Sequence, residues 1–555
     1  MRRRAAGRAG LLFAVAAAAC ALVVVPVLRL AGVAWSAGGG RLGQVVTSAS
    51  FGVAVRNTLL LALAVPALAV PLGTALALAL RRSGVPGRRG WQLAVLLPVL
   101  VPDFVLGYSW TQAYGPGGFT DTLLGWNWAG VPGAVQVGIV LVVGAVPIAY
   151  LVVAAGLAAR AEPLLERAAR ISGAGRWTTT RTVTLPLLAP ALAAASVLVF
   201  VLSLGAFAVP QVLGTPAGFR TVATQIYADL SLGGSPEAFT EAVTLALLLV
   251  VLALVCIAPV DAVMARLRVR RAPGADSVPP PAARAGTDRW IAAGIGAWLA
   301  LTVGLPLVAL ALASLTRAVG VSPTPANWTF AHFQEVLTPR TAEALGRSAV
   351  LAVVAATVLL ALAAGVALVE HGRAGRAVST LATLTVVLPG STLAVAVLLT
   401  YGQRVDPAVL ILLAYLAKFW AFAQRPLSGA RDRLVADEWR AARVSGARPV
   451  TAVRTVLLRS LAPVLAGAWG LVLLTALHEV TMSSLLYGPG GETFAVVVLN
   501  SQELGRIGPT AALSVVLTAL VVVPGVVAGL LVRRPRRAAD RPGVAVVPAG
   551  VPGAG

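Results

Sequence analysis

The sequence predicts an all-α integral membrane protein with about 12 transmembrane helices in two pseudo-symmetric six-helix halves. Three observations lead to this prediction: the composition, the number of long apolar segments, and a polar sequence that occurs twice. Of the 555 residues, 58% are hydrophobic and only 12% are charged, whereas charged residues make up about 25% of an ordinary soluble domain. The composition therefore excludes a water-soluble globular protein.

Twelve apolar segments are long enough to cross the hydrocarbon core of a bilayer, which takes about 20 residues in a helix. Because backbone polar groups in lipid must be hydrogen-bonded within the segment, each one is expected to be a helix. The even number of crossings puts both termini on one side. The expected spans are 11–33, 57–80, 92–112, 135–158, 187–212, 242–264, 290–314, 348–369, 379–400, 407–423, 461–485 and 510–532.

The basic residues predict which side the termini occupy, since cytoplasmic loops carry an excess of Lys and Arg. An N-terminus on the cytoplasmic side places 34 of the 44 Lys and Arg residues on cytoplasmic segments and 9 on or near external ones. The net charge of +23 is then explained by topology and by attraction to anionic headgroups, without any nucleic-acid partner. We expect a multi-pass protein of a bacterial plasma membrane with both termini in the cytoplasm.

The N-terminal sequence, which ends in Ala-Ala-Ala-Cys20, resembles a secretory signal, but we interpret it as an uncleaved first span. The second cysteine, Cys256, also falls within a span, and neither has Cys or His neighbours at metal-ligand spacing. The cysteines therefore predict neither a disulfide framework nor a metal site.

A change in composition after the sixth span divides the chain. Residues 266–289 form a basic stretch followed by one rich in Pro and Ala, which is typical of a linker. The predicted domains are a first six-helix half at 1–265, this cytoplasmic linker, a second six-helix half at 290–533 and a disordered cytoplasmic tail at 534–555.

A polar segment shows that the two halves are repeats, because apolar composition cannot produce its similarity by chance. Residues 167–192 (RAARISGAGRWTTTRTVTLPLLAPAL) and 440–465 (RAARVSGARPVTAVRTVLLRSLAPVL) are identical at 16 of 26 positions without gaps. Both copies lie in the cytoplasmic loop between the fourth and fifth spans of their half. A duplicated unit therefore presents the same loop twice on one face of the membrane.

The repeated loop has the features of a docking surface. A helix-forming Arg-Ala-Ala-Arg leads to a Ser-Gly pair, where glycine permits a tight turn that a Cβ would hinder. The alanines allow close approach of another protein, and the arginines supply charge for headgroups or an acidic partner. The predicted docking residues are Arg167, Ala168, Ala169 and Gly173 in the first copy and Arg440, Ala441, Ala442 and Gly446 in the second.

These residues resemble the signature loop of the inner-membrane permeases of bacterial binding-protein-dependent ABC importers, which have the type I permease fold. The family loop carries Glu-Ala-Ala, a glycine six residues after the Glu, and a later Leu-Pro. The first copy matches at Ala168-Ala169, Gly173 and Leu185-Pro186, and the second at Ala441-Ala442 and Gly446.

The chain departs from this signature in both copies. Arg167 and Arg440 replace the family's Glu, and Leu458-Arg459 replaces Leu-Pro in the second copy. Glu166 and Glu438 lie just upstream and are candidates to supply the displaced charge. The resemblance implies that each loop is a coupling helix that sits in a cleft of one ATPase subunit.

Two further stretches, LGAFAVPQVLG at 204–214 and HEVTMSSLLYGPGGET at 478–493, resemble the fused permeases of the ferric-iron uptake type, to which thiamine permeases are related. The resemblance implies an external binding protein that delivers the substrate, with ferric iron favoured over thiamine, phosphonates or polyamines. The single lysine, Lys418, excludes a G-x-x-x-x-G-K-[ST] phosphate loop. ATP would therefore be bound by a separate polypeptide, and the resemblance implies two such ATPase subunits. We expect no cofactor, metal or catalytic residue in this chain.

Ionisable residues within spans are candidates for function, because burying them in a membrane is costly. Asp103 lies mid-span and is a candidate for the translocation pathway, and so are His478 and Glu479 near the outer end of the eleventh span. The structural alternatives at Asp103 are a hydrogen-bonded carboxyl that fixes helix packing or a short re-entrant bend. His478 and Glu479 could instead face the docking surface for a binding protein, or be interfacial polar residues. Lys418 is expected to extend towards the cytoplasmic interface.

Two other classes of protein remain as alternatives to an importer permease. A secondary transporter with 12 helices would show an acidic and basic motif after its second span, but RRSGVPGRRG at 81–90 has only the basic residues. A membrane-embedded enzyme finds little support, since the chain has no H-E-x-x-H or G-x-S-x-G motif.

Overall fold

The computed structural model describes residues 2–36, 39–82, 84–160, 163–266, 285–369, 372–446 and 458–532. These residues form helices and connecting turns, with one isolated β-bridge between Thr316 and Trp328. The predicted tail at 534–555 and residues 267–284 of the predicted linker lie outside this described part. The linker prediction extended too far at its C-terminal end, because a helix already begins at Ala285.

The first half contains the six expected crossings and several short helices. Its elements are α1 (Arg2–Ala19), η1 (Cys20–Val24), α2 (Val25–Ser36), α3 (Gly39–Val46), α4 (Ala49–Arg82), α5 (Arg88–Ala94), α6 (Leu97–Leu100), α7 (Asp103–Tyr114), α8 (Phe119–Leu124), α9 (Gly133–Arg160), α10 (Pro163–Ile171), α11 (Arg176–Thr179), η2 (Thr180–Thr184), α12 (Leu185–Leu204), η3 (Pro210–Gly214), η4 (Thr215–Ala217), α13 (Val222–Ser231) and α14 (Pro236–Arg266).

The second half repeats this order. Its elements are α15 (Ala285–Leu299), η5 (Ala300–Gly304), α16 (Leu305–Leu315), η6 (Pro325–Asn327), α17 (Ala331–Val336), α18 (Pro339–Val369), α19 (Arg373–Leu384), α20 (Gly390–Tyr401), α21 (Pro407–Val444), α23 (Leu458–Leu477), α24 (Ser483–Leu486), α25 (Phe494–Glu503) and α26 (Ile507–Val532).

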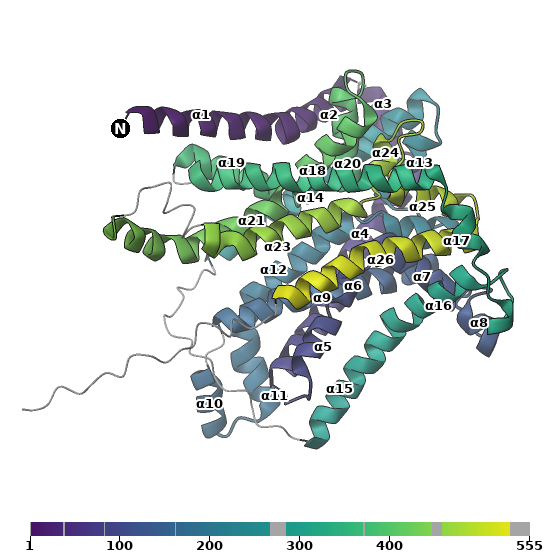
Figure 1. The fold of residues 1–555 in the computed structure, drawn as a ribbon, viewed down its shortest axis with the longest axis horizontal. Helices are drawn as coiled ribbons and strands as arrows, with labels where there is room; N and C mark the ends of the chain where they lie inside the picture. Colours follow the sequence, from purple (N-terminus) through teal and green to yellow (C-terminus); the bar gives the residue numbers. More distant parts are fainter. Residues whose placement is uncertain are drawn as a thin grey trace, which may run out of the picture.

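The twelve predicted spans are largely helical, but not all of them are continuous helices long enough to cross a membrane. Nine helices among the described residues are long and apolar enough to cross a membrane. The remaining three passes are α5–α7, α19–α20 and α23. The start of α1 and the ends of α9 and α21 lie towards one side of the bundle, and α3, α13, α17 and α25 towards the other (Figure 1). We name these the inner and outer sides, after the orientation that the basic residues predict.

Two predicted spans are broken at matching places. The span predicted at 92–112 is interrupted at Val101-Pro102, and the span predicted at 379–400 at Leu388-Pro389. Proline has no N–H for an intrahelical hydrogen bond and disfavours a helical conformation in the residue before it, so each helix restarts after its proline. Asp103 and Gly390 thus become the first residues of α7 and α20.

Other predicted boundaries were wrong because hydropathy does not reveal where a helix ends. The predicted spans 187–212 and 461–485 stop at Leu204 and Leu477, and non-helical turns follow. The span predicted at 407–423 continues to Val444, so the second Arg-Ala-Ala-Arg belongs to one long helix. Polar residues can extend a helix into water, where apolar periodicity no longer marks it.

Hydrogen bonds confirm that the two halves are structural repeats. In the first half, Asn57 Nδ2 donates to Arg220 O over 2.8 Å, and Thr58 Oγ1 accepts from the N–H of Val222 at 2.8 Å. In the second half, Arg347 NH1 donates to Glu492 O over 2.7 Å. There Ser348 Oγ accepts from the N–H of Phe494 at 2.8 Å. Neighbouring residues of α4 and α18 therefore fix the starts of α13 and α25 in the same way.

The first pass of each half packs against the other half. The segment α2 contacts α20, and α16 contacts α7. Each first pass contains a π-helical turn just before a proline, at Pro26 in the first half and Pro306 in the second. In such a turn the N–H of the residue before the proline bonds a carbonyl five residues earlier, at Cys20 in the first half and at Ala300 in the second. Because proline has no N–H, the carbonyl of the following residue, Ala21 or Leu301, is left without a helical donor.

A tyrosine of the opposite half bonds each freed carbonyl. Tyr114 OH donates to Leu301 O over 2.6 Å, and Tyr401 OH donates to Ala21 O over 2.8 Å. Trp110 Nε1 adds a bond to Thr302 O at 3.0 Å. The two halves are therefore tied to each other by equivalent contacts on opposite sides of the molecule.

Candidate functional site

Four helix breaks line a central cavity of about 290 Å³ between the two halves. They are the breaks at Val101-Pro102 and Leu388-Pro389 and the turns after α12 and α23. Its walls come from α7, α9 and the turn after α12 in the first half, and from α21, the turn before α20 and the turn after α23 in the second. The ionisable side chains that line it are Asp103, Lys418, His478 and Glu479. Residues far apart in the sequence, each singled out from the sequence as ionisable within a span, thus meet in one place.

Asp103 is exposed to this cavity and makes no hydrogen bond or ion pair with any described residue. The described residues therefore do not show a hydrogen-bonded carboxyl that fixes helix packing, whereas the break at Val101-Pro102 agrees with the alternative of a short bend. Asp103 is the first residue of α7 after Pro102, where the helix dipole favours negative charge. The equivalent position in the second half is Gly390, so the cavity has a carboxylate on one side only.

Lys418 does not extend to the inner interface as the sequence predicted. It lies inside the long helix α21, and its Nζ donates to Leu388 O at 2.6 Å and to Val386 O at 3.2 Å. These carbonyls belong to the break before α20, where they lack helical donors. The lysine therefore bonds the backbone of the break and also lines the cavity.

His478 and Glu479 lie in the turn after α23 and line the cavity, rather than a lipid interface at the outer end of a span. The Glu479 carboxylate accepts from the N–H of Met482 at 2.8 Å and from the N–H of Ser483 at 3.1 Å. It thereby caps the short helix α24. His478 Nδ1 is buried and has no hydrogen-bond partner among the described residues.

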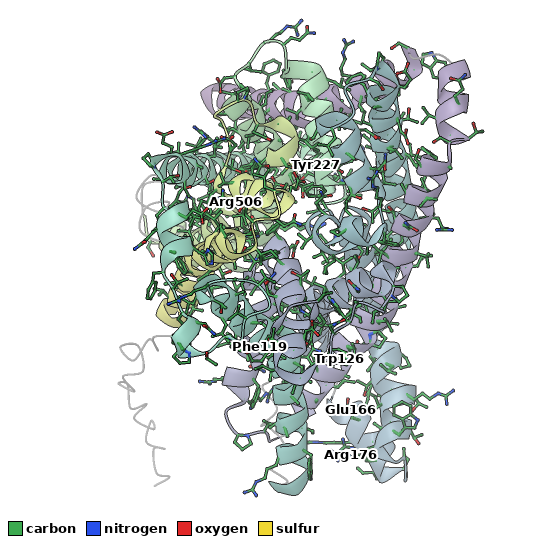
Figure 2. All side chains as sticks on the ribbon, turned by 90° about the vertical axis from the view of Figure 1, so that its right-hand side faces the viewer. Phe119, Trp126, Glu166, Arg176, Tyr227 and Arg506 are labelled. Carbon is green, nitrogen blue, oxygen red and sulfur yellow. The ribbon has the colours of Figure 1, made fainter. Side chains whose placement is uncertain are left out.

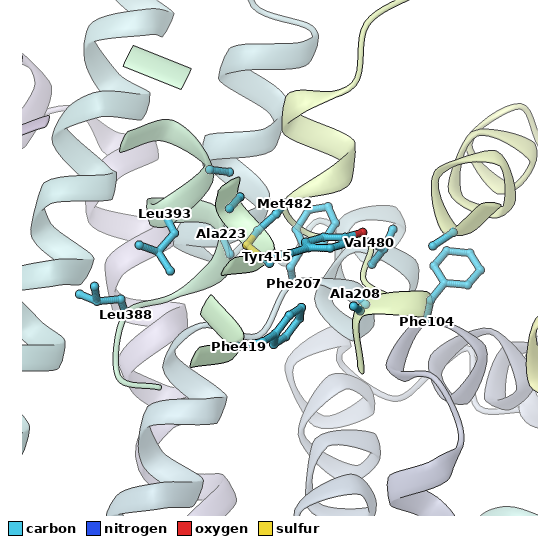
Figure 3. Close-up of a cluster of buried hydrophobic side chains, with 14 of the residues drawn as sticks. Phe104, Phe207, Ala208, Ala223, Leu388, Leu393, Tyr415, Phe419, Val480 and Met482 are labelled. Atoms are coloured by element: carbon cyan, nitrogen blue, oxygen red, sulfur yellow. The ribbon is translucent and has the colours of Figure 1, made fainter. Parts of the chain in front are cut away.

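The apolar part of the cavity wall is shared by the two halves. Phe207, Ala208, Val480 and Met482 from the two equivalent turns lie in one cluster with Phe419 and Tyr415 of α21 (Figure 3). Tyr415 OH forms a hydrogen bond of 2.7 Å with Ser483 Oγ. A hydrophobic lining interrupted by a few polar groups is typical of a binding cavity for a small solute.

The breaks of the two halves touch each other beside the cavity. A Cβ placed on Gly205, in the turn after α12, would lie 3.1 Å from Cβ and 3.3 Å from Cα of Pro389. These contacts are tighter than most contacts of a Cβ atom, so a side chain at this position would require Pro389 to shift by a few tenths of an ångström. Sequence analysis missed Gly205 and Pro389, although the matching prolines at 102 and 389 could have indicated the paired breaks.

On the outer side the halves are joined by polar contacts. Glu503 of α25 accepts from Gln211 Nε2 at 3.0 Å and from Tyr227 OH at 3.2 Å. Tyr108 OH donates to Ile507 O over 3.0 Å. Figure 2 views the molecule from this side, with Tyr227 and Arg506 labelled. These bonds connect elements of the two halves on the outer side.

Asp229 of α13 lies near the outer side, outside the long helices. Burial and the neighbouring Glu241 carboxylate raise the pKa of Asp229 to about 7. Its Oδ1 accepts from Gln225 Nε2 at 2.8 Å, whereas Oδ2 is buried and has no partner among the described residues. A carboxylate held in this way is destabilising when it is ionised.

The first copy of the repeated loop follows α9 towards the inner side as α10, a turn and α11 (Figure 1). Gly173 has φ +85°, in the left-handed region that favours glycine, which confirms the predicted turn. Glu166 Oε1 accepts from Thr184 Oγ1 at 2.8 Å and so connects α10 to η2. Arg167 and Ala168 are exposed and Ala169 is partly exposed, as a docking surface requires.

The second copy has the same turn in a different setting. Gly446 has φ +76°, but the preceding residues continue α21 instead of forming a separate short helix. The side chains of Glu438, Arg440, Ala441 and Ala442 and all of residues 447–457 lie outside the described part of the chain. The two loops are therefore equivalent at their glycines and different in the helix that leads to them.

Sequence analysis missed two apolar residues of the loops. Ile171 is 88% exposed and Val444 is 90% exposed, and they occupy equivalent positions two residues before Gly173 and Gly446. Trp177 is also 73% exposed. Large apolar side chains are thus exposed at matching points of the two loops.

Comparisons with known proteins agree with this architecture. The molybdenum transport system permease protein ModB of Escherichia coli K12 is 35% identical over 179 residues, which are 31% of this chain and 78% of ModB. The ferric transport system permease protein FbpB of Actinobacillus pleuropneumoniae is 33% identical over 166 residues, 29% of this chain and 23% of FbpB.

A third relative is the trehalose transport system permease protein SugA of Mycobacterium tuberculosis, which is 36% identical over 129 residues, 22% of this chain and 41% of SugA. The sequence family described as "binding-protein-dependent transport system inner membrane component" matches residues 69–272 and again residues 357–537. The two matches cover both halves of the repeat. The chain therefore belongs to this family of inner membrane transport components and carries the family domain twice.

Proposed function

We propose that this chain is the complete membrane-spanning pathway of an ABC importer, in which both permease halves are fused and separate ATPase subunits supply the energy. The observation that carries the proposal is the central cavity, which lies between two equivalent sets of broken helices. The same two halves present equivalent glycine turns on the inner side, at Gly173 and Gly446. A pathway on the pseudo-symmetry axis with one docking loop per half fits two ATPase subunits that act together.

The solute is delivered on the outer side by a binding protein, crosses a bacterial plasma membrane through the central cavity, and leaves on the side of both termini. ATP is bound by the partner subunits. Ferric iron is the proposed solute, supported by the resemblance of 204–214 and 478–493 to ferric-iron permeases and by the match to FbpB. The match to ModB supports molybdate as a second candidate.

Co-purification and uptake test this proposal. The tagged chain, purified in mild detergent from cells that express the neighbouring genes, is expected to bring down a P-loop ATPase whose activity is measured in the eluate. Uptake is then measured in proteoliposomes with radiolabelled ferric iron, molybdate and trehalose. Transport that follows an ion gradient and needs no ATP would overturn the proposal in favour of a secondary transporter.

The docking loops are tested by Gly173→Ala and Gly446→Ala. A left-handed conformation costs a non-glycine residue about 1–2 kcal/mol, so each substitution is expected to weaken ATPase co-purification and uptake several-fold. Gly175→Ala is the matched control, because Gly175 lies in the same loop with an ordinary φ of −64°. Normal co-purification and uptake with both test variants would show that these turns do not couple ATP hydrolysis to transport.

A further inference from the structure

Of the charged side chains that line the central cavity, two are hydrogen-bonded to the backbone and one is not. Lys418 donates to Val386 O and Leu388 O, and the Glu479 carboxylate accepts from two backbone N–H groups. Both side chains are therefore already used to stabilise helix breaks. Asp103, in contrast, is exposed to the cavity and bonds to no described residue.

The remaining polar groups that face the cavity are neutral. Nδ1 of His478 has no hydrogen-bond partner among the described residues, and the hydroxyl of Thr475 donates to carbonyls of its own helix, at Leu471 and Val472. The groups left for a solute are thus one carboxylate, an imidazole and hydroxyl oxygens. This set can accept hydrogen bonds and attract positive charge, whereas the cavity's cation, Lys418, is bonded to the protein.

We propose that the central cavity selects cationic solutes over oxyanions, and that Asp103 is the residue that determines this specificity. The inference rests on the proposed function only in taking this cavity as the pathway. Since the equivalent residue in the second half is Gly390, the carboxylate acts from one side, and the solute is held off the pseudo-symmetry axis. The described residues contain no group of three His, Cys, Asp or Glu side chains that could hold a metal ion.

The charge preference is testable without knowing the solute. Cys20 and Cys256 are the only cysteines and are replaced by serine, and a thiol is then introduced by Thr475→Cys. The full chain in lipid nanodiscs is treated with methanethiosulfonate reagents of similar size, one cationic and one anionic. We expect the ratio of the cationic to the anionic reaction rate to be about tenfold higher at this cysteine than with a free thiol in solution.

Asp103→Asn is expected to abolish this preference, whereas Asp121→Asn, which removes the same charge from the short helix α8 outside the cavity, is expected to keep it. A preference unchanged by Asp103→Asn would overturn the inference. The same measurement is made with a second thiol, from Ser203→Cys, which also lines the cavity. It provides the test if the Thr475→Cys variant fails to fold. If neither thiol reacts, the cavity is closed to water-soluble solutes, and the inference is equally overturned.

Uptake separates this inference from the proposed function. In proteoliposomes with the ATPase and binding protein, Asp103→Asn is expected to lower ferric-iron uptake at least tenfold, and Asp121→Asn to leave it at the wild-type rate. If the wild-type system carries another cation, the assignment of iron fails while the cavity's selectivity stands. If it carries molybdate, the selectivity inference fails while the importer function stands.

Discussion

The charged side chains at the central cavity differ in whether their polar atoms are hydrogen-bonded to the protein backbone. Glu479 and Lys418 bond backbone groups that the helix breaks leave without helical partners. In a membrane, where water is not at hand, such groups are costly to leave unbonded. Their polar atoms are therefore used within the protein, whereas Asp103 makes no hydrogen bond or ion pair with any described residue.

Replacing Glu479 by alanine is expected to destabilise the protein more than replacing it by glutamine. Alanine removes the acceptor for the N–H groups of Met482 and Ser483, and each buried donor left unbonded costs about 1–3 kcal/mol. Glutamine retains one acceptor oxygen. Thermal unfolding in detergent would measure the difference, and equal melting temperatures for Glu479→Ala and the wild type would contradict the capping role.

The raised pKa of Asp229 predicts a dependence of stability on pH. Because the folded-state pKa of about 7 exceeds the ordinary value of 3.8, the folded protein binds this proton more tightly than the unfolded chain. Its contribution to stability is complete below about pH 4 and is lost as the pH rises through 7. Asp229→Asn, which mimics the protonated carboxyl, is expected to raise the melting temperature at pH 8 and to change it little at pH 4.

The control for this experiment is Glu343→Gln, an exposed carboxyl on α18. It removes the same charge, and we expect it to leave the difference in melting temperature between pH 4 and pH 8 as in the wild type. If Asp229→Asn shows the wild-type difference as well, the carboxyl is not held in an unfavourable ionised state.

Helices and turns are arranged by a few prolines and glycines. Prolines at 102 and 389 start α7 and α20 at the cavity, and prolines at 26 and 306 produce the π-helical turns whose carbonyls the opposite half bonds. Each effect follows from the missing N–H of proline. The missing N–H of proline therefore accounts both for the helix breaks at the cavity and for the contacts between the halves.

The contact between Gly205 and Pro389 predicts the effect of adding a side chain at position 205. Gly205→Ala would place a Cβ 3.1 Å from Pro389 Cβ, so the two breaks must separate, and uptake is expected to fall at least several-fold. Gly144→Ala is the matched control, since Gly144 lines the same cavity and its Cβ would lie 3.7 Å from Leu106 Cδ2, an ordinary contact. Equal loss of uptake in both variants would show that cavity volume, not the contact between breaks, is decisive.

At the scale of the whole molecule, the two halves hold each other through their exchanged first passes. α2 covers α20, and α16 covers α7, so each half has an apolar surface that its own helices leave to the partner. This arrangement makes association of the halves depend on packing and hydrogen bonds across the interface, and not only on the covalent linker.

Cutting the chain within residues 267–284 is therefore expected to yield two polypeptides that assemble and transport. Co-expressed halves with a tag on one should co-purify in detergent at near-equal amounts, and their uptake should approach that of the fused chain. Adding Tyr114→Phe and Tyr401→Phe, which removes both bonds to the freed carbonyls, should reduce co-purification. Halves that fail to associate would show that the linker is essential to assembly.

The sequence alone determined the helical membrane fold, the twelve crossings, the duplication and the glycine turns at Gly173 and Gly446. These features are local or repeated, since hydropathy acts over a single span and the repeat is visible by direct comparison. The sequence also singled out Asp103, Lys418, His478 and Glu479, because a charge within a span is costly wherever it lies.

Only the tertiary structure decided what those residues do. Lys418 meets the carbonyls of a break some 30 residues away in sequence, and Gly205 meets Pro389 of the other half. Hydropathy could not show where helices end, because an apolar turn and an apolar helix have the same composition. Whether a buried charge is free or bonded depends on which backbone groups packing brings beside it, and this is how Asp103 came to differ from Lys418 and Glu479.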